Sequence, residues 1–310
     1  MKSQNNINFN VIVYHDNCND GICSLWCAYH YNNNNNFTQI GIGASKDLDL
    51  KKYNMKDKII IFTDVCPSIE SLIELSSIAK HITVIDHHET NLRKSEDSRL
   101  KSIPNIKMIF DMKRSACMMT WDYFFEGEKR PWFIEHVGDR DIWAQKLKYN
   151  NEIIKAIEFF EFINAKHLDK LDKLYDYDKE MLKKLIKFGK KIILITNKIL
   201  NDESKYTREA TIDVNKKTYR IWVGTIKSDL VSDFGNLLTT KKFNDDTYPD
   251  FILIWNYIPT SDSWAISLRG NDNSPNLSKI AEEFGGGGHP KASGFKLTNG
   301  KKLQSILVFI

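Results

Sequence analysis

Cysteine is scarce in this chain of 310 residues, and its distribution excludes two common architectures. There are five cysteines, an odd number, and no pair of them has the CxxC spacing. This pattern argues against a disulfide framework and against a structural zinc knuckle, and it fits reduced thiols. Long apolar runs are missing as well: none approaches the ~18 residues of a membrane span, and the N-terminus has no apolar signal core. We therefore expect a cytoplasmic protein that does not contact a membrane.

An excess of charge of one sign is also absent. Lysine and arginine number 44 against 40 aspartates and glutamates, which gives a formal net charge of +4. So small an excess, in a sequence full of Asn, Lys and Ile, indicates an AT-rich genome rather than a nucleic-acid-binding surface. With 42% hydrophobic and 27% charged residues, the chain has the composition of a soluble globular protein, and its length favours two domains.

Apolar strands alternate with helices in the first half of the chain. We expect strands over 8–14, 38–42, 58–62, 82–85 and 106–110, and helices over 21–30, 68–79 and 115–125. The five consecutive asparagines at 32–36 are typical of a solvated loop. Strands joined by helical crossovers form a parallel sheet that is covered on both faces.

The second half changes character twice. From about residue 151 to 200, repeated apolar positions among many lysines are typical of amphipathic helices. After residue 206 we expect strands over 209–214, 218–223, 251–257 and 264–268, and helices over 229–238 and 277–284. The sequence thus predicts an α/β fold with a parallel-sheet domain over 1–165, a helical connector over 166–205 and a smaller mixed α/β domain over 206–310.

Polar side chains collect where the strands of the first domain end. The segment "HITVIDHHET" runs from a buried strand directly into Asp86, His87 and His88. The segment "YHDNCNDG" follows the first strand, Asp64 follows the third, and "GDRDIW" adds two more carboxylates. In parallel α/β sheets, ligands bind beyond the carboxyl ends of the strands. Carboxylates gathered there repel one another unless cations neutralise them, and mixed carboxylate and imidazole ligands suit Mn²⁺, Mg²⁺ or similar ions.

Each cluster also has a purely structural explanation. A single aspartate after a strand, such as Asp64, usually caps a turn or a helix. Asp86, His87 and His88 alone would suit a capped loop with a hydrogen-bonded histidine. The coincidence of three clusters at matching ends of one predicted sheet favours a metal centre. Two ions about 3.5–4 Å apart would stabilise both oxygens of an in-line phosphoryl displacement.

Five segments, taken in order, resemble a known family. They are "YHDNCNDG", "FTD", "VIDHHET", "GDRDIW" and "GGGGHPKASGF". The set is similar to the DHH phosphoesterase superfamily with a C-terminal DHHA1 domain, and it spans about residues 9–295. The chain looks nearest to the exopolyphosphatase-related and oligoribonuclease-like branch. Other branches include single-strand exonucleases, bisphosphate-nucleotide phosphatases and cyclic-dinucleotide phosphodiesterases.

The resemblance implies a two-metal site with a separate substrate clamp. The metal ligands would be His15, Asp20, Asp64, His87 and Asp139, with Asp64 shared by both ions. Two Mn²⁺ ions are expected, with Mg²⁺, Co²⁺, Fe²⁺ or Zn²⁺ as alternatives. His88 would act on the substrate phosphate, and Asp86 would orient the histidines. The clamp would consist of Arg269, Gly286, Gly287, Gly288 and His289.

Glycines in such a clamp let backbone N–H groups approach phosphate oxygens, and an arginine suits a bidentate phosphate grip. The alternative for the glycine run is a flexible linker. Cys18 departs from the family pattern, because many members have an aspartate there. It is either a soft ligand that favours Zn²⁺ or Fe²⁺ or a plain buried thiol. Asp139 is preferred to Asp141 as a ligand because the more common family motif uses its first aspartate.

The predicted function is metal-dependent hydrolysis of short oligonucleotides or small nucleotide phosphodiesters. Inorganic polyphosphate is the alternative substrate, and a catalytically inactive nucleic-acid-binding protein is the alternative class. A base-stacking platform would favour nucleotides, although aromatic residues on strands are more often core. The candidates for stacking are Trp222, Trp255, Tyr257 and Trp264, whereas Trp143 is expected in the core. The oligomeric state is left open, with a homodimer as one option.

Overall fold

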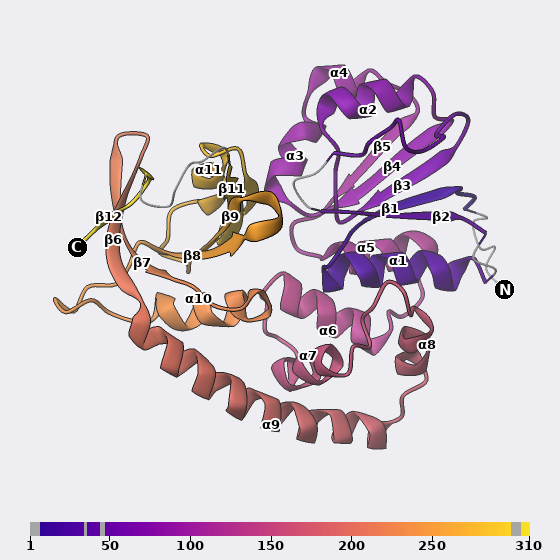
Figure 1. Ribbon diagram of the computed structural model, residues 1–310. Coiled ribbons are helices and arrows are strands. Elements are labelled where there is room, and N and C mark those ends of the chain that lie inside the picture. Colours follow the sequence, from indigo (N-terminus) through magenta and orange to yellow (C-terminus); the bar gives the residue numbers. More distant parts are fainter. Residues whose placement is uncertain (1–6, 34–35, 44–46, 299–304) are drawn as a thin grey trace. The chain divides into compact units, whose positions relative to one another are not determined.

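A computed structural model describes residues 7–33, 36–43, 47–298 and 305–310 (Figure 1). The chain divides into two compact units, Met1–Ile193 and Leu194–Ile310. Each unit is built around its own β-sheet. None of the helices in the described part of the chain combines the length and the apolar character that a membrane span requires.

The sheet of the first unit has five strands in the order β2-β1-β3-β4-β5, and its neighbouring strands run parallel. The strands are β1 (Val11–His15), β2 (Thr38–Ile42), β3 (Ile59–Thr63), β4 (His81–Asp86) and β5 (Ile106–Phe110). The helices are α1 (Asn19–Tyr31), α2 (Ile69–Ser76), α3 (Glu89–Ser95), α4 (Ser98–Lys101), α5 (Ala116–Phe124), α6 (Trp132–Asp141), α7 (Asn150–Phe159) and α8 (Asp169–Tyr175). The long helix α9 (Lys179–Glu203) contains the boundary between the units.

Both faces of this sheet are buried, which explains why its strands are apolar throughout. Along β1, Ile12 and Tyr14 belong to the core on the side of α1 and α5, whereas Val11 and Val13 belong to the core on the side of α2 (Figure 1). Successive strand residues point to opposite faces, so each strand contributes to both cores. Burying one large aliphatic side chain contributes about 1.5–3 kcal/mol, and this double burial holds the strand ends in place.

The sheet of the second unit has the order β10-β11-β9-β8-β7-β6-β12. Its strands are β6 (Arg208–Val214), β7 (Lys217–Gly224), β8 (Phe251–Ile258), β9 (Ser263–Arg269), β10 (Gly287–His289), β11 (Ala292–Leu297) and β12 (Val308–Phe309). Among these strands β7 and β8 are parallel, and the other neighbouring pairs are antiparallel. Among the described residues, the unit also contains the helices α10 (Val231–Thr239) and α11 (Leu277–Glu282) and 3₁₀ turns at Ser204–Tyr206, Ser228–Leu230 and Pro259–Ser261.

The predicted fold class is confirmed: a parallel-sheet unit precedes a mixed-sheet unit, with a long helix between them in the chain. The proposed three-part domain division remains a prediction. Several features differ from the expected elements. The glycine-rich stretch contributes to the β10–β11 hairpin instead of forming a flexible linker. Helices α3, α4 and α6 and strand β12 were not expected. Part of the asparagine run, residues 34–35, lies outside the described residues.

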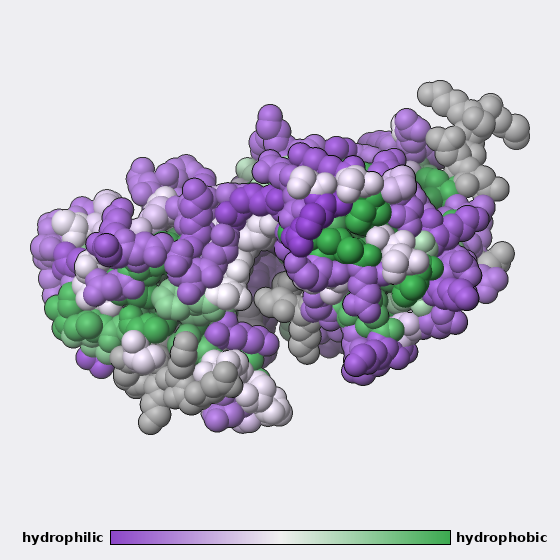
Figure 2. All heavy atoms as spheres, turned by 90° about the horizontal axis from the view of Figure 1, so that it is seen from above, coloured by the Kyte–Doolittle hydropathy of each residue, from purple (hydrophilic) through white to green (hydrophobic). Residues whose placement is uncertain are grey.

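The surface is mostly hydrophilic on the face shown in Figure 2, with smaller hydrophobic areas between the polar ones. Some large apolar side chains are nevertheless well exposed, among them Phe159 at 61% and Leu194 at 72%. Exposed apolar side chains are normal in soluble proteins.

Candidate metal centre

Three neighbouring strands of the first unit end side by side. His15 ends β1, Asp64 follows β3, and Asp86 ends β4. The registers of β1 with β3 and of β3 with β4 align these ends within one residue. The sequence-predicted clusters therefore meet at the carboxyl edge of the sheet, where parallel α/β proteins bind their ligands.

The two carboxylate oxygens of Asp64 face different histidines. Oδ2 lies 3.1 Å from His15 Nδ1, and Oδ1 lies 3.4 Å from His87 Nε2. The backbone of Asp64 has a φ of +60°, and its amide donates a hydrogen bond to the Ile85 carbonyl at 2.9 Å. Aspartate is one of the few residues that tolerate this left-handed conformation. Burial alone would raise the pKa of Asp64, but the contacts with His15 and His87 outweigh it and hold the pKa well below its usual range.

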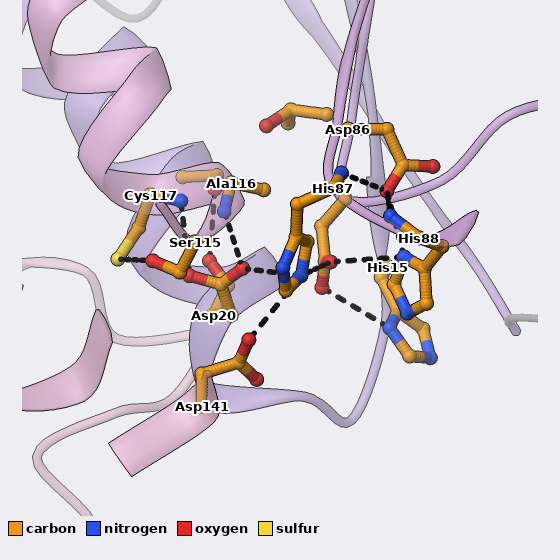
Figure 3. A network of polar contacts seen from close by, with 12 residues as sticks. His15, Asp20, Asp86, His87, His88, Ser115, Ala116, Cys117 and Asp141 are labelled. Carbon is orange, nitrogen blue, oxygen red and sulfur yellow. Dashed lines mark hydrogen bonds and ion pairs between the residues drawn. The ribbon is translucent and has the colours of Figure 1, made fainter. Parts of the chain in front are cut away.

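His87 stands at the centre of three carboxylates (Figure 3). Its Nε2 lies 3.2 Å from Asp141 Oδ2, 3.4 Å from Asp64 Oδ1 and 3.5 Å from Asp20 Oδ2. Burial would lower the pKa of His87, but these carboxylates, Asp141 foremost, raise it to about 10. One imidazolium can balance the charge of only one ionised carboxylate, so the three carboxylates compete for it.

Asp20 reaches this cluster from the first turn of α1 and is held by the start of α5 (Figure 3). Its Oδ2 accepts a hydrogen bond from the Ala116 amide at 2.7 Å, and its Oδ1 accepts one from the Cys117 amide at 2.9 Å. Amides at a helix N-terminus stabilise a carboxylate. Even so, burial and the neighbouring Asp64 charge raise the pKa of Asp20.

Gly21 allows α1 to begin directly against β1. A Cβ atom at this position would lie 2.1 Å from the backbone oxygen of His15. No side chain fits into that space without displacing His15. The glycine that follows Asp20 in the sequence is therefore part of what positions the histidine.

Asp86 is fully buried and orders the residues that follow β4. Its Oδ1 accepts hydrogen bonds from the His87 amide at 2.6 Å and from the His88 amide at 3.1 Å, and it lies 2.6 Å from His88 Nδ1. Its Oδ2 accepts a hydrogen bond from Asn91 Nδ2 at 2.6 Å. Burial would raise the pKa of Asp86, but the His88 ring outweighs it and lowers the pKa. The role of Asn91 was not predicted, and nothing in the sequence spacing signals it.

The two aspartates of "GDRDIW" have different surroundings. Asp139 accepts hydrogen bonds from the Lys146 amide at 2.8 Å and from Asn150 Nδ2 at 2.6 Å, so it orders the segment after α6. Asp141 is the one that contacts His87. The structure therefore brings Asp141 into the cluster in place of the expected Asp139. Side chains two residues apart on a helix are rotated by about 200° around the helix axis and so point to nearly opposite sides, and both cannot face the same histidine.

A second group of candidate ligands surrounds Asp64. The ligand atoms of His15, Cys18 and Asp64 lie within 4.8 Å of one another. Burial, followed by the charges of Asp64 and Asp141, raises the pKa of the Cys18 thiol well above its usual value. Cys18 therefore lies beside His15 and Asp64, and its role as a soft ligand or as a plain buried thiol remains a prediction.

This donor set fits divalent cations. Asp64 Oδ1 and Asp141 Oδ2 receive no hydrogen bond from any described residue, although both atoms are buried. Burial and the neighbouring Asp20 charge raise the pKa of Asp141 to about 7. Several buried carboxylates that share one imidazolium are costly, and a cation lowers that cost. Carboxylates and imidazoles suit Mn²⁺ and similar ions, and a cysteine adds a softer ligand.

The predicted clamp residues lie together at one end of the second sheet. Arg269 ends β9 and His289 ends β10, and both pair with Ala292 of β11, one from each side. Strands lie about 4.8 Å apart, so these two backbones are about 10 Å apart. The Arg269 guanidinium donates to the Leu268 carbonyl at 2.9 Å and to Ser232 Oγ at 3.3 Å. Burial lowers the pKa of Arg269 to about 10.

The glycines next to His289 are held in the hairpin rather than in a linker. A Cβ atom on Gly286 would lie 2.1 Å from the Gly294 carbonyl oxygen, so only glycine allows this approach of β10 to β11. Gly288 has a φ of +138°, which side chains rarely adopt. The clamp role of Gly286, Gly287 and Gly288 remains a prediction.

The aromatic candidates differ in exposure. Trp255 and Trp264 pack against each other with ring centroids 5.1 Å apart, and Trp222 packs against a phenylalanine ring. Tyr257 is 45% exposed. Trp143, which we expected in the core, is instead 36% exposed. The sequence interpretation of Trp143 is therefore wrong, because the residue lies after the end of α6 rather than on its buried face.

Comparison with known proteins supports the family resemblance. Residues 211–310 match the family model of the DHHA1 domain. The chain is thus a two-unit α/β protein with a C-terminal DHHA1 domain, as the sequence predicts, and the sequence Asp-His-His stands at the end of β4. A curated relative, the uncharacterized protein R106 of Acanthamoeba polyphaga mimivirus, is 28% identical over 311 residues. That match covers 92% of this chain and 66% of the relative, so the chain spans just under two thirds of the relative's length.

Solved structures give weaker matches of similar extent. One is PggH of Vibrio cholerae, described as a pGpG-specific phosphodiesterase, with 12% identity, a TM-score of 0.45 and coverage of 94% of each chain. Another is an exopolyphosphatase-related protein of Bacteroides fragilis, with 14% identity, a TM-score of 0.44 and coverage of 96% of this chain and 88% of that one.

Proposed function

We propose that this protein is a metal-dependent phosphohydrolase that cleaves short oligonucleotides or small nucleotide phosphodiesters. The observation that carries the proposal is the position of Asp64, whose two oxygens face His15 and His87. One carboxylate is therefore shared by two groups of ligands, as a two-metal centre requires. The DHHA1 domain at residues 211–310 supports the same conclusion.

Two divalent cations would be held by side chains from four separate stretches of the chain. His15, Cys18 and Asp64 form one group, and Asp20, His87 and Asp141 form the other, with Asp64 Oδ1 3.4 Å from His87. We propose Mn²⁺, with Mg²⁺, Co²⁺, Fe²⁺ or Zn²⁺ as alternatives. When bound, such ions lower the pKa of a water molecule and neutralise phosphate charge.

His88 is the residue placed to act on the substrate. Its Nδ1 lies 2.6 Å from Asp86 Oδ1, and its side chain is 18% exposed. Burial would lower the pKa of His88, but the Asp86 carboxylate outweighs it and raises the pKa. With Nδ1–H donated to Asp86, the ring has its Nε2 left for a phosphate oxygen or the leaving oxygen, to which it can donate when it is protonated. Asp86 is thus a positioning residue that fixes both the proton and the ring.

The second unit carries a candidate anion-binding site of its own. Arg269 has two neutral acceptors as its partners, so its charge is not cancelled by them. Such a guanidinium, with the Gly286, Gly287 and Gly288 backbone and His289 on the neighbouring strand pair, suits a phosphate or another anionic group. Inorganic polyphosphate would satisfy the same groups and stays the alternative substrate.

A hydrolysis panel with Mn²⁺ tests the proposal. It should contain di- to pentanucleotides, cyclic dinucleotides, a 3′,5′-bisphosphate nucleotide, polyphosphate and pyrophosphate, with product masses as the readout. We expect hydrolysis of a nucleotide substrate that Asp64→Asn and His87→Ala abolish. Asparagine is chosen at position 64 because it tolerates a positive φ. Asp16→Asn is the control, because Asp16 belongs to the same motif but to neither ligand group.

Two outcomes would contradict the proposal in different ways. Hydrolysis of polyphosphate alone would overturn the substrate. Binding of RNA without turnover in Mn²⁺, Mg²⁺, Co²⁺, Fe²⁺ or Zn²⁺ would identify a catalytically inactive nucleic-acid-binding protein.

A further inference from the structure

The helix that carries Asp141 ends in an unusual way. The Ala144 amide donates to the Asp139 carbonyl at 3.0 Å, and the Trp143 amide donates to the Arg140 carbonyl at 3.2 Å. These two hydrogen bonds define a Schellman motif, with Trp143 at the position after the helix cap. Its φ is +53°. Glycine is the usual residue at this position, because a side chain is disfavoured in the left-handed conformation.

The indole of Trp143 is exposed and also fixed. It is 36% exposed, and the Arg140 guanidinium lies over its ring, 4.2 Å from the centroid. Arg140 is held in turn by a hydrogen bond from Nη1 to Asn151 Oδ1 at 3.0 Å. A cation on one face of the ring fixes its orientation. Backbone strain and exposure of a large ring at one residue indicate a functional role more than a packing role.

The segment that follows is basic and aromatic. The stretch "IWAQKLKY" at 142–149 contains two lysines and no acidic residue. Tyr149 also has a positive φ, +61°, and is 37% exposed. Lys148 Nζ lies 4.9 Å and Lys190 Nζ lies 5.2 Å from its ring centroid. Aromatic rings interleaved with cations are typical of surfaces that bind single-stranded nucleotides, where rings stack on bases and cations contact phosphates.

Trp143 lies close in the chain to a residue of the candidate metal centre. Trp143 follows Asp141 by two residues, so their Cα atoms are no more than about 7.6 Å apart, since consecutive Cα atoms are about 3.8 Å apart. Asp141 Oδ2 in turn lies 3.2 Å from His87 Nε2. An exposed ring and the reacting phosphate would thus be within the reach of one nucleotide.

We propose that Trp143 is the platform on which a base of the substrate stacks, with Arg140 behind the indole and Lys146 and Lys148 toward the phosphates. The inference rests on the proposed hydrolase and specifies its substrate. A nucleotide gains binding from the stacked base, whereas inorganic polyphosphate has no ring to place there. Trp143 then determines specificity without touching the reacting atoms.

Three substrates and three variants test this inference. The substrates are a dinucleotide, the same dinucleotide without its bases, and polyphosphate; the variants are Trp143→Gly, Trp143→Phe and Tyr53→Ala. Trp143→Gly should raise KM for the dinucleotide about 10-fold or more, as expected for one stacked base, and leave KM for the other two substrates unchanged. Trp143→Phe keeps a ring and should lose less. Tyr53, which is equally exposed at 37% in the same unit, is the control and should have no effect.

A melting curve separates binding from structure. Because glycine relaxes the positive φ, Trp143→Gly should keep or raise the melting temperature. A lower melting temperature together with an equal loss of activity on all three substrates would overturn the stacking role. An unchanged KM for the dinucleotide would overturn it as well, while Asp64→Asn would still report on the hydrolase.

Binding without turnover distinguishes failure of this inference from failure of the proposed function. Calorimetric titration of the dinucleotide in EDTA needs no hydrolysis. If no substrate is cleaved but Trp143→Gly weakens this binding about 10-fold, the proposed hydrolase activity is contradicted and the stacking role of Trp143 is supported. If cleavage occurs and binding does not depend on Trp143, the stacking role of Trp143 is contradicted and the proposed hydrolase activity is supported.

Discussion

Asp141 Oδ2 lies 3.2 Å from His87 Nε2, the shortest of the three carboxylate distances at this histidine. Asp139, two residues earlier on the same helix, accepts hydrogen bonds from the segment after the helix instead. One aspartate therefore faces the candidate metal centre, and the other fixes the chain that leads away from it. The two residues should give opposite phenotypes when they are changed.

Asp141→Asn should lower kcat for the Mn²⁺-dependent reaction by about 100-fold or more, because changes even to outer partners of a metal site cost about 10–100-fold. Its free energy of unfolding without metal should stay the same or rise, because one of three like charges around His87 is removed. Mn²⁺ titration calorimetry and urea unfolding measure the two effects. Full activity in this variant would remove Asp141 from the site.

Asp139→Asn should behave in the reverse way. An amide replaces one acceptor oxygen with a donor that meets the Asn150 or Lys146 N–H groups. Loss of charge-assisted hydrogen bonds should reduce the free energy of unfolding by about 2 kcal/mol. Mn²⁺ affinity, measured on protein that is still folded, should change much less than in Asp141→Asn. A stable Asp139→Asn protein that no longer binds Mn²⁺ would restore the family-based assignment.

Gly21→Ala should disturb His15, because the new Cβ would meet the His15 carbonyl oxygen at 2.1 Å. Overpacking of this kind costs about 1–3 kcal/mol and should also weaken Mn²⁺ binding. Gly127→Ala is a matched control. Gly127 has a φ of +77°, and a Cβ atom added to it would meet no other atom within 4 Å, so this variant should lose about 1 kcal/mol through strain and keep its Mn²⁺ affinity. Equal Mn²⁺ binding in the two variants would show that Gly21 does not position the ligand.

Asn91→Ala should lower both stability and turnover. Asn91 Nδ2 donates to Asp86 Oδ2 at 2.6 Å, and hydrogen bonds to charged groups contribute about 1.5–3 kcal/mol. Since Asp86 orients His88, we expect kcat to fall about 10-fold. Asn91→Asp should be worse than alanine, because it places a second carboxylate against Asp86. Turnover that is unaffected in Asn91→Asp would show that the bond serves stability alone.

Mn²⁺ should raise the melting temperature of the protein. A ligand at about 100 times its dissociation constant stabilises the folded state by about 2.7 kcal/mol, which corresponds to about 5–10 °C for a unit of this size. The shift should be largely absent in Asp64→Asn, which removes the shared carboxylate charge. Differential scanning calorimetry of both proteins with Mn²⁺ and with EDTA provides the measurement. The same shift in both proteins would place the Mn²⁺ at another site.

The fold could be predicted from the sequence because its apolar strands and amphipathic helices are long and regular. The strand-end residues His15, Asp64 and Asp86 could be predicted for the same reason, since parallel strands share one carboxyl edge. The β10–β11 hairpin could not, because its glycines mask the alternation that marks a strand. Short edge strands such as β12 carry too few residues to show a pattern.

The remaining site residues depend on information that lies outside the local sequence. The choice between Asp139 and Asp141 required the rotation of α6, although Asp141 does share a helix face with the buried Val137 and Gly138. The bond from Asn91 to Asp86 and the bonds from Ala116 and Cys117 to Asp20 join residues whose partners no spacing rule identifies. The two hydrogen bonds to Asp20 each join residues more than 90 positions apart in the chain.

The hydrogen bonds from the first turn of α5 to Asp20 affect how mutational surveys of this protein should be interpreted. Apart from its first-turn amides, α5 is mainly a core helix, with Met118, Met119 and Trp121 buried. A cavity made beneath it would tilt the helix and shift the amides that Asp20 needs. Variants at these apolar positions would then lose activity because the Asp20 carboxylate is displaced. A survey based on activity alone would wrongly count these buried residues as substrate contacts.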